Sequence, residues 1–164
     1  MTINKRRLLI AGAACALPVS YAQIQSTETD LPLPASKLNL SPLPLLNGDF
    51  FQPQSLNQQW LVLYYWASWC PFCAQQTPFM QKLHEQVNNK GMTVLGVSID
   101  KQLHNAKIHF QKYSYTFASA WLNPLLKSVN YKPKTIPTTL IYNPQQILVQ
   151  AEKGQMFAED IENL

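Results

Sequence analysis

The chain has 164 residues, of which 46% are apolar and 13% are charged. That balance fits one globular domain with a real core, and the length leaves little room for a second domain. Much of the net charge of +4 comes from residues 1–22, which contain Lys5, Arg6 and Arg7 but no acidic residue. Removing these residues lowers the net charge to +1, so the basic balance of the full chain does not indicate nucleic-acid binding.

Residues 1–22 have the pattern of an export signal peptide. The basic residues precede an apolar run from Leu8 to Val19, which ends in the small-x-small sequence Ser20-Tyr21-Ala22. We expect cleavage after Ala22 and a periplasmic or otherwise exported protein. An uncleaved membrane anchor is the alternative, but about a dozen apolar residues fall short of the ~20 that span a bilayer. The arginine pair followed by two leucines resembles a twin-arginine signal, so either export route fits.

Cys15 lies inside this segment and offers a second way to process it. Lipoprotein-type cleavage would leave Cys15 as an acylated N-terminus, but such sites have a larger aliphatic residue where Gly12 stands. Membrane contact is therefore expected only if the signal is uncleaved or Cys15 is lipidated. With cleavage after Ala22, Cys70 and Cys73 are the two cysteines of the mature chain.

The elements of the mature chain begin after a proline- and serine-rich stretch. Residues 23–41 have no hydrophobic period and predict an extended arm or linker, and residues 42–164 predict the domain. The apolar and aromatic run Leu61–Trp66 is typical of a strand buried on both faces. Phe79, Leu83 and Val87 then recur at four-residue spacing and predict a helix, which Lys90-Gly91 ends.

A second strand and helix follow this first pair. Thr93–Ile99 predicts a buried strand, and Asp100 is expected to cap a helix whose apolar face includes Ala106 and Phe110. The order strand, helix, strand, helix indicates a βαβ unit with a right-handed crossover. The last expected elements are a short helix at Asn123-Pro124, an antiparallel hairpin of Thr138–Tyr142 with Ile147–Ala151, and a short helix from about Phe157. The fold class is therefore α/β, with α/β/α layers.

Cys70 and Cys73 stand where the first strand passes into the first helix. Residues three apart on a helix have Cβ atoms about 5–6 Å apart, which permits a disulfide after small adjustments. The free amides and positive end of the helix favour a thiolate at Cys70 and lower the pKa of its thiol. An exposed thiolate attacks disulfides, and Cys73, one turn further along, is placed to resolve the product.

Two other interpretations of the cysteine pair remain open at this point. A zinc site needs two more ligands, and the candidates are His84, His104 and His109. His104 and His109 start some thirty residues after Cys73, further than the spacing of 12–15 typical of a finger, and they fall on a predicted amphipathic helix. A structural disulfide is the other interpretation, but closing a loop this short removes little unfolded-state entropy.

Three motifs together resemble a known family. They are Trp66-Ala67-Ser68-Trp69-Cys70-Pro71-Phe72-Cys73, Pro78 five residues after the second cysteine, and Thr135-Ile136-Pro137-Thr138-Thr139 before the late hairpin. From about Asn39 to its end the chain resembles thioredoxin-fold proteins of the exported TlpA/ResA type, which include thiol-disulfide oxidoreductases of cytochrome c maturation. The resemblance implies a thioredoxin-like three-layer α/β/α fold with a central mixed sheet.

The resemblance also implies roles for individual residues. Cys70 is the attacking thiol, Cys73 the resolving thiol, and Pro137 a cis proline opposite the pair, although an ordinary proline at the start of a strand is the alternative. The backbone of Ile136 is then free to pair with a substrate segment, and Trp69 is expected in the substrate-binding site.

Two positions depart from the family pattern. Tyr64 stands where thioredoxins have a buried aspartate, and Gln76 stands where many exported relatives have a glutamate. Either carboxylate would act as a base for the resolving thiol, so this chain must transfer that proton to water or to another group. The dipeptide Pro71-Phe72 also lacks the histidine that stabilises the thiolate of a strong oxidant, and the redox direction stays open.

The resulting hypothesis is an exported enzyme that exchanges disulfides with protein thiols or disulfides and works as a reductant. It would need a membrane electron donor and no metal, other cofactor or nucleic acid. Alternatives are a disulfide-donating oxidase or isomerase, and a copper or haem-pathway chaperone that uses the thiolates as soft ligands. A peroxiredoxin would need a threonine three residues before a lone cysteine, and none is present.

Overall fold

The computed structural model describes residues 31–87, 90–122 and 131–164. Its elements in chain order are β1 (Leu43–Pro44), β2 (Phe50–Phe51), η1 (Pro53–Leu56), β3 (Trp60–Trp66), α1 (Pro71–Val87), β4 (Met92–Ser98), α2 (Leu103–Lys112), β5 (Ala118–Trp121), β6 (Thr138–Tyr142), β7 (Leu148–Lys153) and α3 (Ala158–Glu162). The expected signal peptide and the helix expected at Asn123-Pro124 lie outside the described residues. Within the described ranges, no helix is long and apolar enough to cross a membrane.

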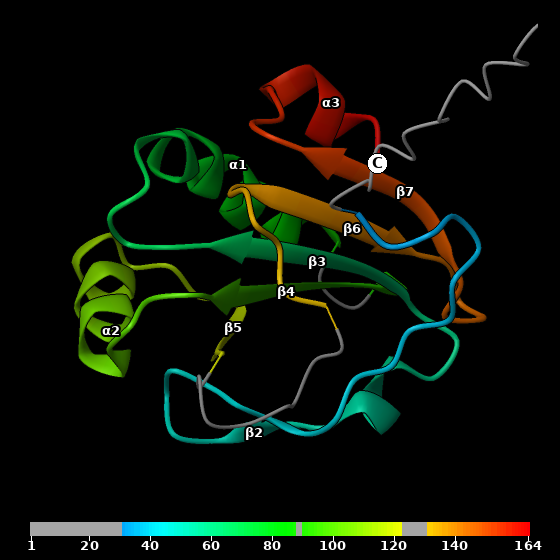
Figure 1. Cartoon of the computed structure of the whole chain (residues 1–164), viewed down its shortest axis with the longest axis horizontal. Helices are drawn as coiled ribbons and strands as arrows, with labels where there is room; N and C mark the ends of the chain where they lie inside the picture. Colours follow the sequence, from blue (N-terminus) through cyan, green and yellow to red (C-terminus); the bar gives the residue numbers. More distant parts are fainter. Residues whose placement is uncertain (1–30, 88–89, 123–130) are drawn as a thin grey trace, which may run out of the picture.

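Five strands form one mixed sheet in the order β5-β4-β3-β6-β7 (Figure 1). Strands β3, β4 and β5 run parallel, whereas β6 pairs antiparallel with both β3 and β7. Strand β3 lies in the middle, which explains its unbroken apolar sequence: Val62, Tyr64 and Trp66 face one core, and the residues between them face the other. The buried strands, the first helix and the late hairpin predicted from the sequence are confirmed.

The three α-helices of the described residues pack on one face of the sheet. Met80 and Leu83 of α1, Ala106 and Phe110 of α2, and Ile161 of α3 share a buried cluster with the β3 side chains of that face. Helix α1 continues through Pro78 without a break. In Figure 1, α2 lies at the end of the sheet toward which β3 and β4 point, so the loops that follow these strands meet beside it.

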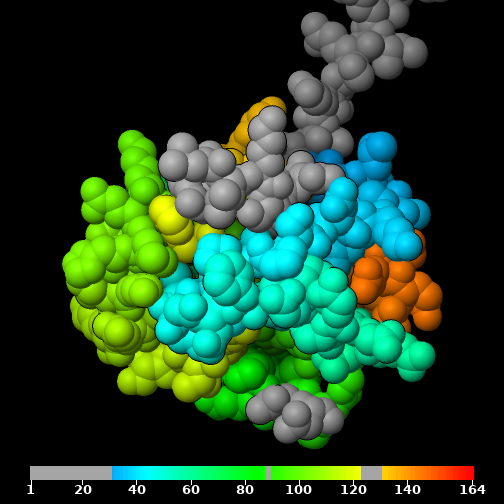
Figure 2. Space-filling model, turned by 90° about the horizontal axis from the view of Figure 1, so that it is seen from below, coloured from blue at the N-terminus to red at the C-terminus, as the bar shows by residue number. Residues whose placement is uncertain are grey.

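The N-terminal segment, residues 31–56, covers the other face of the sheet. Leu43, Phe51 and Leu56 pack against the second core cluster, and Figure 2 shows residues of this segment, in blue to cyan-green, spread over that face. The segment is tied to the start of β7 by backbone hydrogen bonds. Ala35 N donates to the Leu148 carbonyl at 3.1 Å, and Leu148 N donates to the Ser36 carbonyl at 2.9 Å.

Two features of the β4 region differ from the sequence-based expectations. The residue that caps α2 is Gln102, without a side-chain cap bond, so the prediction that Asp100 caps this helix is wrong. Strand β5 was not expected, because its sequence Ala-Ser-Ala-Trp is short and has no clear alternation. It pairs with β4 so closely that a Cβ added to Gly96 would lie 2.8 Å from Ser119 Oγ, which explains a glycine inside a strand.

Candidate active site

The two cysteines occupy the junction between β3 and α1, as the sequence predicts. Cys70 immediately precedes α1, Cys73 lies in its first turn, and the two form a disulfide with a Cα–Cα distance of 5.2 Å. The Cys73 amide donates to Cys70 Sγ at 3.1 Å. Cys70 is 4% exposed and Cys73 1%, so Cys70 is the more accessible residue of the two. A backbone donor at a helix N-terminus is suited to stabilising a thiolate at Cys70.

The loop before β6 approaches the disulfide from the other side. The Ile136–Pro137 peptide bond is cis, and Cys70 Sγ lies 3.8 Å from the Ile136 carbonyl oxygen. Two hydrogen bonds hold this loop: Thr138 Oγ1 donates to the Thr135 carbonyl at 2.7 Å, and Gly154 N donates to the Pro137 carbonyl at 2.9 Å. Residues more than sixty positions apart in the chain therefore meet at one sulfur atom.

A groove of about 440 Å³ opens beside Cys70, between α2 and residues 67–70, the cysteine loop that joins β3 to α1. The side chains that line it come from the cysteine loop and from the region of α2, and they include Trp69, Cys70, Ile108, His109, Lys112 and Tyr113. Trp69 is 64% exposed, whereas Trp66 is fully buried and donates from its indole nitrogen to Ser119 Oγ at 3.1 Å. Trp69 thus lies on the surface beside the disulfide, and Trp66 belongs to the core.

Tyr64 occupies the position of the thioredoxin aspartate, beneath the first turn of α1. Its hydroxyl donates to the Cys73 carbonyl at 3.3 Å and lies 3.0 Å from Thr77 Oγ1, which also donates to that carbonyl, at 2.6 Å. Burial raises the pKa of Tyr64 far above its usual value. The phenol therefore stays protonated at neutral pH and braces the helix turn that carries Cys73.

Gln76 occupies the position of the glutamate found in many exported relatives, and it is fully buried. Its amide nitrogen donates to Thr139 Oγ1 at 3.1 Å, and its carbonyl oxygen accepts from Met156 N at 2.9 Å. Both ends of the amide are thus used to join α1 to β6 and to the segment before α3. The amide does not titrate, so it cannot exchange a proton with Cys73.

Asp100, which was expected to cap α2, is a buried carboxylate beside the cysteine loop. It is 1% exposed, and it accepts from Ser68 N at 3.0 Å, from Ser68 Oγ at 2.6 Å and from Ser98 Oγ at 2.7 Å. The signal that could have found it is its place at the end of β4. The carboxyl ends of parallel neighbouring strands meet at one edge of the sheet, so Asp100 and Ser68 were bound to be close.

The three histidines considered as zinc ligands lie in different surroundings. His109 packs against the rings of Trp66 and Tyr113, with centroids 5.4 and 4.8 Å away, and burial lowers the pKa of His109 despite the opposing charge of Asp100. His84 is near Phe117, and His104 is exposed. Within the described residues, no three histidine, cysteine or acidic side chains are grouped to hold a metal ion.

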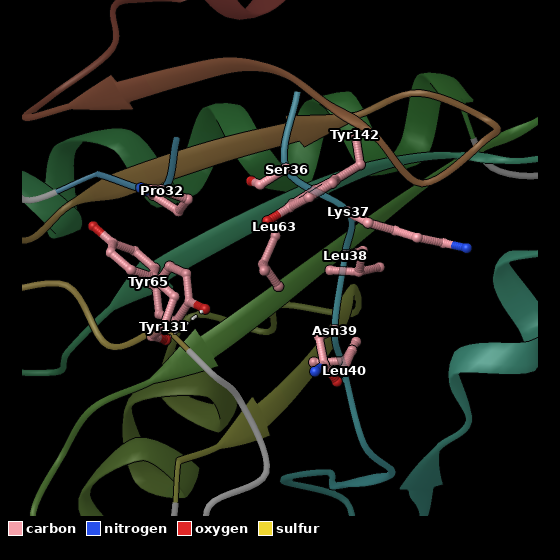
Figure 3. Close-up of a pocket in the computed structure, with 10 residues that line it drawn as sticks. All are labelled: Pro32, Ser36, Lys37, Leu38, Asn39, Leu40, Leu63, Tyr65, Tyr131 and Tyr142. Carbon is pink, nitrogen blue, oxygen red and sulfur yellow. Dashed lines mark hydrogen bonds between the residues drawn. The ribbon is translucent and has the colours of Figure 1, made fainter. Parts of the chain in front are cut away.

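A second hollow, of about 240 Å³, lies between the N-terminal segment and the sheet (Figure 3). Tyr65 and Tyr142 line it together with Tyr131, whose carbonyl accepts a hydrogen bond from the Tyr65 hydroxyl at 3.1 Å. Burial raises the pKa of Tyr142 to about 12. Because Tyr65 points to the opposite face of β3 from Tyr64, this hollow is separated from the disulfide by the sheet.

The model of the AhpC/TSA family matches residues 34–151, which is most of the chain. The chain belongs to the AhpC/TSA family. A relative of similar sequence is the thiol-disulfide oxidoreductase ResA of Halalkalibacterium halodurans, 22% identical over 117 residues that cover 71% of this chain and 66% of ResA. ResA of Oceanobacillus iheyensis is 27% identical, and the match covers 68% of this chain and 58% of that protein. The chain thus spans less than two thirds of the length of these relatives.

The fold of this AhpC/TSA member also matches solved structures. A DsbE-type thiol:disulfide interchange protein from Chlorobium tepidum superposes with a TM-score of 0.70 at 22% identity, covering 79% of this chain and 92% of that one. The predicted thioredoxin-like α/β fold with a mixed sheet is confirmed, and so is the resemblance to the TlpA/ResA type. The predicted roles of Cys70, Cys73, Trp69, Ile136 and Pro137 stay predictions.

Proposed function

We propose that this protein is a thiol-disulfide oxidoreductase that exchanges disulfides with other proteins through Cys70 and Cys73. The observation that carries the proposal is the disulfide itself, which joins the residue before α1 to the first turn of that helix, with Cys70 Sγ 3.8 Å from the carbonyl oxygen of Ile136 in the cis Ile136–Pro137 bond. The names of the ResA and DsbE relatives support the same activity.

The reaction begins from the dithiol form of the protein. The Cys70 thiolate attacks one sulfur of a substrate disulfide, a mixed disulfide forms, and the other substrate sulfur leaves as a thiolate that takes a proton. The Cys73 thiolate then attacks Cys70 Sγ, which releases the second substrate thiol and closes the Cys70–Cys73 disulfide. Two electrons pass from the protein to the substrate, so a reduced substrate and an oxidised protein result.

The surroundings of Cys70 suit the first of these steps. The Cys73 amide would stabilise the attacking thiolate, and Trp69, Ile136 and Pro137 would contact the substrate next to it. The resolving step has no carboxylate in the two family positions, since these hold Tyr64 and Gln76. We infer that the Cys73 proton passes to water or to another group, because neither of these two positions holds a carboxylate.

We further propose that the protein is exported and acts as a reductant. The basic, apolar and small-residue pattern of residues 1–22 supports export. An exported compartment is oxidising, so a membrane electron donor would have to return the pair to its dithiol form. The absence of a histidine in Pro71-Phe72 supports a reductant over a strong oxidant.

Activity and redox potential test these proposals separately. Insulin reduction by the mature protein should be lost in Cys70→Ser, whereas Cys73→Ser should accumulate a mixed disulfide that identifies the substrate. Full reductase activity in Cys70→Ser would show the nucleophile to be another group. Equilibration with glutathione or dithiothreitol should give a potential near −270 mV, as for thioredoxin, and a value near about −120 mV would assign disulfide donation instead.

A further inference from the structure

One long stretch of the chain near the redox site carries basic residues but no acidic ones. No acidic residue occurs between Asp100 and Glu152, and this stretch contains six lysines. It supplies α2, β5, β6 and the loop before Pro137. Since Asp100 is buried, it adds no exposed negative charge to this side of the molecule.

The other acidic side chains of the described residues lie on other elements. Three belong to α3, where Glu162 pairs with Lys82 of α1, and Glu85 lies on the far half of α1, while Asp49 lies between β1 and β2 and Glu152 on β7. The cysteine loop thus has a basic border on the α2 side. Lys112 lines the same groove as Cys70, and Lys101 directly follows the aspartate that binds Ser68.

Three large apolar or aromatic side chains line the groove: Trp69, Ile108 and Tyr113. Ile108 on α2 and Tyr113, which follows this helix, are each 49% exposed, and they line the groove together with Trp69 of the cysteine loop. Lys112 Nζ lies 5.3 Å from the centre of the Tyr113 ring, so the cation stands directly at the apolar surface. Large apolar side chains that stay exposed beside a reactive sulfur, with a cation at their edge, are typical of a protein-docking surface.

We propose that the groove between Cys70 and α2 binds a segment of the partner protein that carries apolar and acidic residues beside its reactive cysteine. This docking surface rests on the proposed function, since the partner must reach Cys70. The apolar residue packs against Trp69, Ile108 and Tyr113, and the carboxylate faces Lys112. The one-sided charge selects partners chiefly through the rate of encounter and excludes segments with basic flanks.

Three peptide disulfides of matched size test the charge preference. Each is the homodimer of Ac-X-Leu-Gly-Cys-Gly-Leu-X-NH2, in which X is Glu, Gln or Lys. The reduced mature protein is mixed with each peptide, and the second-order rate constant is divided by the rate constant of dithiothreitol with the same peptide. We expect the Glu peptide to react about ten-fold faster than the Lys peptide at low salt. Screening at about 0.5 M salt should reduce this ratio to about two or less.

A matched pair of charge reversals locates the effect. Lys112→Glu should lower the ratio of the Glu-peptide rate to the Lys-peptide rate about five-fold. Lys112→Gln should lower the logarithm of this ratio about half as much. Lys90→Glu is the control, because Lys90 is exposed and lies beyond the far end of the 17-residue helix α1, about 25 Å from Cys70. It should leave the ratio unchanged. Ile108→Ser should slow all three peptides.

The small uncharged disulfide 2-hydroxyethyl disulfide separates the two proposals. If the wild-type protein reduces it but treats the three peptides alike, or prefers the Lys peptide, the docking surface is wrong and the oxidoreductase activity stands. An equal effect of Lys90→Glu and Lys112→Glu overturns the assignment to this groove. The assignment is also overturned if the wild-type protein forms a dimer that Lys112→Glu dissociates. If no disulfide is reduced, both the activity and the docking surface are refuted.

Discussion

Replacement of Asp100 is expected to destabilise the protein through the cysteine loop. The carboxylate accepts hydrogen bonds from Ser68 N, Ser68 Oγ and Ser98 Oγ, and it is buried. In Asp100→Ala the two hydroxyls can turn toward other acceptors, but the Ser68 N–H loses its partner. Hydrogen bonds to charged groups contribute about 1.5–3 kcal/mol each, and the partial recovery leaves an expected loss of about 3 kcal/mol. Asp100→Asn retains one acceptor oxygen and should lose about half as much.

Urea unfolding of the oxidised protein, followed by circular dichroism, measures this loss. A loss of 3 kcal/mol is a large part of the ~5–15 kcal/mol typical of a domain, and it should lower Tm by about 10 °C. Ser68→Ala should cost about 1 kcal/mol in the wild type and almost nothing beside Asp100→Ala, because both changes remove the same bond. Asp49→Ala is the control, since Asp49 is exposed and should change stability by less than about 0.5 kcal/mol. A loss below about 1 kcal/mol in Asp100→Ala would refute the reasoning.

Three further predictions concern Gly96, His109 and Gln76. Gly96→Ala should cost about 2 kcal/mol in urea unfolding, because its Cβ would lie 2.8 Å from Ser119 Oγ; a neutral result would show that β4 and β5 separate easily. Burial lowers the pKa of His109, so the folded state binds fewer protons, and stability should fall as pH drops below about 6.5. His109→Gln should flatten this slope, and an unchanged slope would assign it to other groups. Gln76→Glu buries a carboxyl group whose pKa rises, so the variant should lose stability as pH increases from about 5 to 8; equal pH profiles for variant and wild type would contradict this.

Most of the sheet could be predicted from the sequence because its central strands have distinctive apolar sequences. β3 and β4 are unbroken apolar runs, and the stripe of α1 repeats at helical spacing, so burial and periodicity identify them without knowledge of tertiary contacts. β5 was missed because Ala-Ser-Ala-Trp fits a strand only once β4 is beside it. Its placement depends on pairing, which local sequence does not contain.

The site was predictable where its motifs are contiguous and unpredictable where contacts are distant. The spacing of Cys70 and Cys73 indicated a redox pair only together with the strand-to-helix junction, Pro78 and the motif around Pro137. Asp100 was assigned to the nearest helix because aspartate is a common cap, yet Ser68, 32 residues earlier, donates two hydrogen bonds to its carboxylate near the disulfide. The partners of Gln76, on β6 and before α3, likewise lie more than sixty residues away and follow only from the fold.

The attachment of the N-terminal segment to β7 has a consequence for the order in which the chain acquires structure during synthesis. Ala35 and Ser36 leave the ribosome early, but the Leu148 backbone that they bind is made more than a hundred residues later. Until then this segment has no partner at the sheet edge, and the face that it covers stays open. The first described residues can therefore pair with the sheet only when almost the whole chain has been made. Throughout most of synthesis the growing chain lacks these backbone hydrogen bonds.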